Sequence, residues 1–142
     1  MTTLVLSVDG VLAHTPEGAN LLHYESAPEG RILYDTLKHT SRVILLCSDS
    51  YEERVVSWLI RERFSKYAGL YCYPLGSGLT PEEWKVSKIL DLIGIGHSLA
   101  FFVSANPATV QAALDVGVSA MLVAYSSVIP GKSQHIKDSY PS

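Results

Sequence analysis

Five short apolar runs alternate along the chain with longer stretches in which apolar residues recur at helical spacing. We predict that the short runs are strands, because aliphatic and aromatic residues fill nearly every position, as in strands covered on both faces. These runs span residues 3–8, 42–47, 69–73, 99–103 and 120–124. The longer stretches are predicted helices, and they span about 28–39, 51–65, 81–92 and 107–116.

This alternation predicts an α/β fold. We expect a single Rossmann-like three-layer domain, a five-stranded and mostly parallel sheet with helices on both faces. A chain of 142 residues, 47% of them hydrophobic, is long enough to bury one sizeable core. The domain is predicted to span residues 1–125, with a loop or flap insertion at 11–28 that carries a short hairpin near 21–24. Residues 126–142 are predicted to be an irregular tail.

The predicted helix starts carry capping signals. Ser26 with Glu29, and Ser50 with Glu53, have the spacing of a capping box, and Thr80 is followed by Pro81 and Glu83. Apolar spacing predicts the buried helix faces, while Trp58 is compatible with either core or surface. The predicted buried positions are Ile32, Leu33 and Leu37; Val55, Val56, Leu59, Ile60 and Phe64; and Val86, Ile89, Leu90 and Ile93.

Charge and composition exclude several classes of function. The net charge is only -3 and no block of like charge occurs, so there is no clear nucleic-acid footprint. No apolar run reaches the roughly 20 residues of a membrane span, and no signal peptide is recognisable. Cys47 and Cys72 lie in strand-like runs and are predicted to be buried reduced thiols, which favours a cytoplasmic protein. The five histidines have no metal-ligand spacing and are assigned to the surface or to loops.

Polar residues follow several of the predicted strands. In a parallel sheet the ligand crevice lies outside the carboxyl ends of the strands, where the strand order changes direction. Three groups occupy such ends and are expected to converge there: Ser7 to Asp9, Ser48 with Asp49, and Ser104 to Asn106.

Four segments in this order resemble the four motifs of the haloacid dehalogenase (HAD) phosphatase superfamily. The first strand ends in Ser7-Val8-Asp9-Gly10, and the second is VILLC followed by Ser48. Lys85, with Lys88 as the alternative, fits the lysine at the start of a helix in motif three. Residues 104–118 are similar to the fourth motif through its Ala-Ala and Gly-Val pairs. The resemblance covers about residues 3–124. The compact size and Asp-Gly-Val-Leu are also similar to the capless HAD domains linked to nucleic-acid end repair.

The resemblance implies which chemistry the chain lacks. In the family, the first aspartate of motif one attacks phosphorus and binds Mg²⁺, and its counterpart here is Ser7. The acidic residues of motif four complete the metal site, and their counterparts are Ala105 and Thr109. Mg²⁺ requires hard oxygen ligands that include carboxylates, so this site is expected to be very weak. Ser7 would need an adjacent base to act as a nucleophile, and Asp9 alone is a weak one.

Other motif residues are retained. Asp9 stands where the family has its general acid, and the alternative is that it caps the turn after the first strand. By resemblance, Ser48 and Lys85 would bind a phosphate or another anion. Asp49 is a weak candidate metal ligand, and a solvated turn aspartate is the alternative role.

These features predict a catalytically degenerate HAD-like protein rather than an enzyme. No residue is assigned a catalytic role, and Ser7 and Asp9 are regarded as vestigial. The chain is expected to need no cofactor and to act by binding a protein partner, a second copy of itself or a small anion. One alternative is a divergent metal-dependent phosphatase rebuilt around Asp9, for which Mg²⁺ would be the cofactor. Another is a structural or self-assembling subunit.

Overall fold

A five-stranded, entirely parallel sheet forms the centre of the protein. The computed structural model describes residues 2–15 and 19–125. The strands are arranged in the order β3-β2-β1-β4-β5, which confirms the predicted α/β, Rossmann-like fold. Their bounds are β1 Thr3–Ser7, β2 Arg42–Cys47, β3 Gly69–Cys72, β4 Leu99–Ser104 and β5 Ala120–Leu122.

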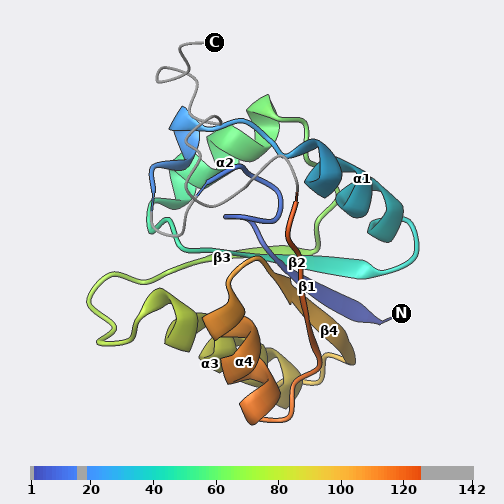
Figure 1. Cartoon of the computed structure of the whole chain (residues 1–142), viewed down its shortest axis with the longest axis vertical. Coiled ribbons are helices and arrows are strands. Elements are labelled where there is room, and N and C mark those ends of the chain that lie inside the picture. Colours follow the sequence, from blue (N-terminus) through green and yellow to red (C-terminus); the bar gives the residue numbers. More distant parts are fainter. Residues whose placement is uncertain (1, 16–18, 126–142) are drawn as a thin grey trace.

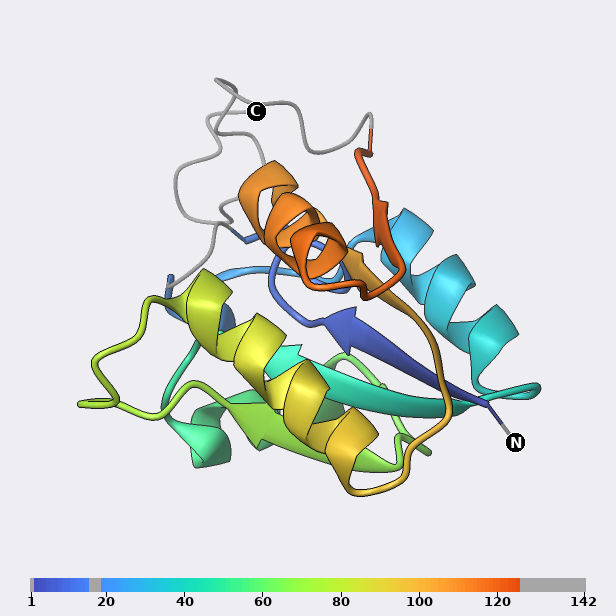
Figure 2. The ribbon, with the colours of Figure 1, turned by 90° about the horizontal axis from the view of Figure 1, so that it is seen from below.

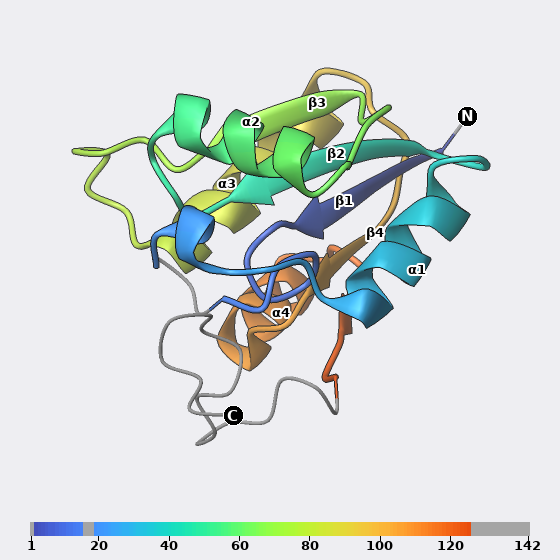
Figure 3. The same cartoon turned by 90° about the horizontal axis from the view of Figure 1, so that it is seen from above.

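Four α-helices cover the two faces of the sheet, as predicted. Helices α1 (Pro28–Leu37) and α2 (Glu52–Arg61) lie on one face, and α3 (Pro81–Gly94) and α4 (Pro107–Asp115) lie on the other (Figure 1). Figure 2 looks onto the α3 and α4 face, and Figure 3 onto the α1 and α2 face. Helix α2 ends earlier than predicted, because Arg63 adopts a left-handed φ of 61° that takes the backbone out of the helix.

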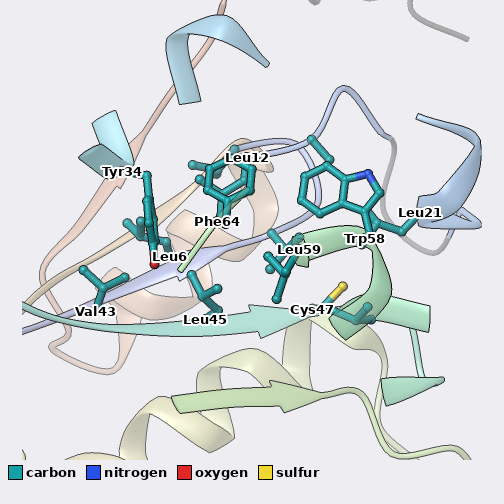
Figure 4. Packing of buried hydrophobic residues seen from close by; sticks show 14 of the residues in the cluster. Leu6, Leu12, Leu21, Tyr34, Val43, Leu45, Cys47, Trp58, Leu59 and Phe64 are labelled. Atoms are coloured by element: carbon teal, nitrogen blue, oxygen red, sulfur yellow. The ribbon is translucent and has the colours of Figure 1, made fainter. Parts of the chain in front are cut away.

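The core between the sheet and helices α1 and α2 is built around large side chains (Figure 4). Leu6 and Leu45 come from the sheet, and Tyr34 and Trp58 come from the two helices. Trp58 is fully buried, stacks on Phe64 with ring centroids 5.6 Å apart, and donates its indole N–H to the Tyr24 carbonyl at 3.0 Å. This places Trp58 in the core, whereas the sequence was compatible with either core or surface.

Four of the predicted core positions are wrong, because their side chains are exposed. Ile32 on α1 is 68% exposed and Ile60 on α2 is 70% exposed. Helix α1 faces the core through Gly30 and Tyr34, and a Cβ atom at Gly30 would lie 2.1 Å from the Val11 carbonyl oxygen. This close approach fixes the rotation of α1 and turns Ile32 outward. Near the end of α3, Leu90 and Ile93 are also more exposed than predicted.

The capping signals have mixed outcomes. The Thr80–Glu83 capping box is present with both of its hydrogen bonds, so this prediction is confirmed. The other two predicted boxes are absent, since the N-cap residues are Ala27 and Tyr51 and neither side chain caps its helix. The backbone N–H of Tyr51 instead donates to the Asp49 carboxylate at 3.0 Å.

The segment that follows β1 packs against the α1 and α2 core. Val11, Leu12 and Ala13 have no solvent exposure, and Ala13 forms an isolated antiparallel bridge with Ser26. The predicted hairpin near 21–24 is wrong, because Leu21–His23 is a short 3-10 helix, η1. The predicted tail at 126–142 lies outside the described residues. Within the described part of the chain, no helix is long and apolar enough to cross a membrane.

Candidate functional site

The carboxyl ends of β1, β2 and β4 meet at the centre of the sheet. Strand β1 lies between β2 and β4, and the strand order changes direction there. Asp9, after β1, contacts Ser48, after β2. A Cβ atom at Gly10 would lie 2.9 Å from the Ala105 Cβ, so the loop after β4 also approaches closely. The three strand ends therefore converge, as the sequence predicts.

Asp9 is the centre of a buried hydrogen-bonded network. Its Oδ1 accepts the backbone N–H of Ser48 at 3.0 Å, and its Oδ2 accepts the Ser48 hydroxyl at 3.1 Å. The Lys85 ammonium donates to the same Oδ2 at 3.0 Å. Both carboxylate oxygens of Asp9 are thus engaged inside the protein.

Lys85 reaches Asp9 from the first turns of α3. Its side chain is only 1% exposed, so a charged group lies inside the protein and requires an opposite charge beside it. The capping box at Thr80 fixes the start of α3, and Trp84 and Val86 pack on the sheet on either side of Lys85. The local sequence therefore directs the lysine inward toward the end of β1.

Hydroxyl and methyl groups occupy the positions where the family resemblance places carboxylates. Ser7 and Thr109 have no solvent exposure, and their hydroxyl oxygens have no hydrogen-bond partner among the described residues. Ser7 lies on the same face of β1 as Val5, which packs toward α3 and α4, because side chains alternate along a strand. Ala105 contributes only a methyl group. A buried serine with no base beside it is not an activated nucleophile.

The Asp49 carboxylate binds Arg54 and Tyr51 and is separate from the network around Asp9. The Arg54 guanidinium forms two hydrogen bonds of 2.7 Å with its carboxylate, and the Tyr51 N–H adds a third. Burial acts to raise the pKa of Asp49, but these hydrogen bonds and the Arg54 charge hold it below its ordinary value. The alternative that Asp49 is a solvated turn aspartate is wrong, because its side chain is buried and paired with Arg54.

Arg54 is the residue that sequence reasoning missed. It lies on the first turn of α2, beside the exposed ring of Tyr51, and it binds both oxygens of Asp49. An arginine in the first helical turn shortly after a loop aspartate is the only sequence signal for this pair. The contact stabilises the turn between β2 and α2, directly after Ser48.

The residues at these strand ends do not fit a magnesium ion. Mg²⁺ needs carboxylate oxygens that are free to coordinate it, whereas both oxygens of Asp9 accept hydrogen bonds from Ser48 and Lys85. Among residues 2–15 and 19–125, no group of three or more His, Cys, Asp or Glu side chains could hold a metal. The predicted anion-binding roles of Ser48 and Lys85 stay predictions, and here both residues bind the protein's own carboxylate.

The fold and the site define a single parallel α/β domain with a buried ion pair at the carboxyl end of its central strand. No protein-family model matches the chain, and no curated protein matches it. Similar folds occur among solved structures. A chain in "Structure of the Pnkp1/Rnl/Hen1 RNA repair complex" matches with a TM-score of 0.75 and 16% identity, over 87% of this chain and 42% of that chain.

A second chain, in "Structure of Pnkp1/Rnl/Hen1 complex", matches with a TM-score of 0.72 and 16% identity, over 87% of this chain and 46% of that one. At this level of identity the similarity shows the fold alone. The present chain spans less than half the length of either match.

Proposed function

We propose that the chain is a HAD-like domain that has lost metal-dependent hydrolysis and acts by binding a protein partner. The observation that carries this proposal is the Asp9–Lys85 ion pair. The acidic residue retained from motif one is neutralised by the lysine that the resemblance assigns to phosphate binding. Where the resemblance expects further carboxylates, the chain has Ser7, Ala105 and Thr109.

The same ion pair favours a protein partner over a small anion. Lys85 and Ser48 are the groups that an anion would need, and Asp9 already presents its negative charge to both of them. An anion entering this site would have to displace a carboxylate that the protein cannot release.

Metal binding and phosphatase activity test the proposal together. We expect the wild-type chain to bind no Mg²⁺ in calorimetry and to release no p-nitrophenol from p-nitrophenyl phosphate. The variant Ser7→Asp/Ala105→Asp supplies two carboxylates to the crevice and is expected to gain a rise in unfolding temperature with Mg²⁺. Asp49→Asn is the matched control, because it changes a carboxylate outside this network.

Two outcomes would contradict the proposal at different points. Mg²⁺-dependent turnover by the wild-type chain that disappears in Asp9→Ala would show that the hydrolase chemistry persists. If the double variant folds but gains no response to Mg²⁺ or Mn²⁺, the crevice differs from the HAD arrangement and the resemblance ends at the fold.

A further inference from the structure

The two cysteines of the chain, distant in sequence, are neighbours in the sheet. Cys47 ends β2 and Cys72 ends β3, and the two residues are paired in the parallel register of these strands. Side chains of paired residues on adjacent strands point to the same face. Both cysteines accordingly pack into the core beneath α1 and α2, where Figure 4 shows Cys47 beside Leu59.

The strand register places the two cysteines within the usual Cα range of a disulfide bond. Adjacent strands lie about 4.8 Å apart, and the Cα atoms of bonded cysteines are usually about 4.4–6.8 Å apart. Strand β3 is an edge strand of four residues, so it can adjust toward β2 without disturbing a further neighbour. The chain has only two cysteines, which leaves one intramolecular pairing.

We propose that Cys47 and Cys72 form a redox modification site, in which hydrogen peroxide converts the two thiols to a reversible disulfide between β2 and β3. Cys72 is partly exposed at the sheet edge, whereas Cys47 is fully buried. The Cys72 thiolate therefore attacks the peroxide first and becomes a sulfenic acid, while the O–O bond breaks and water leaves. The Cys47 sulfur then attacks the Cys72 sulfur, the S–O bond breaks, and a second water leaves. The two thiols lose two electrons and two protons, and one peroxide is reduced to two waters.

The surroundings of the two thiols make their oxidation slow and pH-dependent. Burial raises the pKa of the Cys72 thiol to about 12 and raises that of Cys47 well above its ordinary value. Only the thiolate reacts, so little reactive sulfur is present at neutral pH and oxidation quickens as the pH rises. The pair thus stays reduced under brief exposure and responds to a sustained oxidant.

The bond would fasten the sheet edge next to the candidate site. Ser48 and Asp49 follow Cys47 directly, and the backbone N–H of Tyr73 donates to the Cys47 carbonyl at 2.9 Å. A covalent link here restricts the unfolded chain and should raise the unfolding temperature until a dithiol reduces it. This inference concerns the sheet edge and does not depend on the proposed function.

Peroxide treatment of the full chain, followed by alkylation, trypsin digestion without reduction and mass spectrometry, tests the site. We expect residues 43–54 and 67–85 to appear as one cross-linked species, two hydrogens lighter than the sum of the two peptides. Dithiothreitol should separate them and reverse the rise in unfolding temperature. Oxidation should also proceed faster at higher pH.

The controls distinguish native geometry from chance pairing. Cys72→Ser should abolish the cross-link, and the guanidinium-unfolded wild-type chain should yield less intramolecular product relative to dimers and over-oxidised thiols. The proposal is overturned if the native chain yields sulfinic or sulfonic Cys72 with Cys47 still alkylatable, if it yields intermolecular dimers, or if both thiols survive prolonged oxidation unchanged.

Discussion

The buried charge pair of Asp9 and Lys85 is the main polar interaction at the end of β1. Both side chains are nearly inaccessible to solvent, so each needs the other to offset the loss of hydration. Sequence alone could align Asp9 and Lys85 with two separate motifs, but it could not show that they bond to each other. They are 76 positions apart, and only the packing of α3 on the sheet brings them into contact.

We expect Asp9→Asn to destabilise the protein by about 3–5 kcal/mol, because it removes the carboxylate charge that faces the buried Lys85 ammonium. Lys85→Met should also be costly, since the buried Asp9 carboxylate would lose the ammonium charge beside it. The double variant Asp9→Asn/Lys85→Met removes both charges and should be more stable than Asp9→Asn. Urea denaturation of the four proteins measures this cycle. Additive losses in the double variant would show that the two residues act independently.

At the scale of elements, the sequence predicts type and order better than orientation. All five strands and four helices were predicted from periodicity, because buried parallel strands and amphipathic helices have different apolar spacing. Periodicity correctly placed Val55 and Leu59 of α2 and Val86 and Ile89 of α3 in the core, but it did not determine which face of α1 is buried. The face of α1 depends on the close approach of Gly30 to Val11, which is a tertiary contact. Ile32 is exposed for this reason.

Sequence spacing also failed to distinguish real capping boxes from apparent ones. One box of each kind allows a direct comparison. Thr80→Ala removes a hydroxyl that accepts the Glu83 N–H at 3.1 Å, so we expect a loss of about 1 kcal/mol in unfolding free energy. Ser50→Ala is the matched control, because Ser50 has the same sequence spacing to Glu53 but lies outside the cap of α2. Its effect should stay within about 0.5 kcal/mol. Equal losses in thermal or urea unfolding would contradict this distinction.

The whole molecule has two sheet edges of different character. Lys88 of α3 lies 4.0 Å from the centroid of the Tyr71 ring on β3, which places a positive charge near that edge. On β5, Met121 and Leu122 are about half exposed, and residues 116–125 contain no charged side chain. Charges near an edge discourage pairing with another chain, and Lys88 supplies one near β3, so β5 is the edge to test first for contact with a partner.

The first partner to test at the β5 edge is a second copy of the chain. An uncharged, apolar edge is compatible with itself, because a two-fold contact brings identical groups together without repulsion between like charges. We expect light scattering during size-exclusion chromatography to detect a dimer whose fraction rises with concentration. Met121→Lys should shift it to the monomer by placing like charges opposite each other, whereas Ile60→Lys, on the exposed face of α2, should leave it unchanged. A wild-type chain that stays monomeric at high concentration would exclude self-association and leave a different protein as the partner of the proposed binding function.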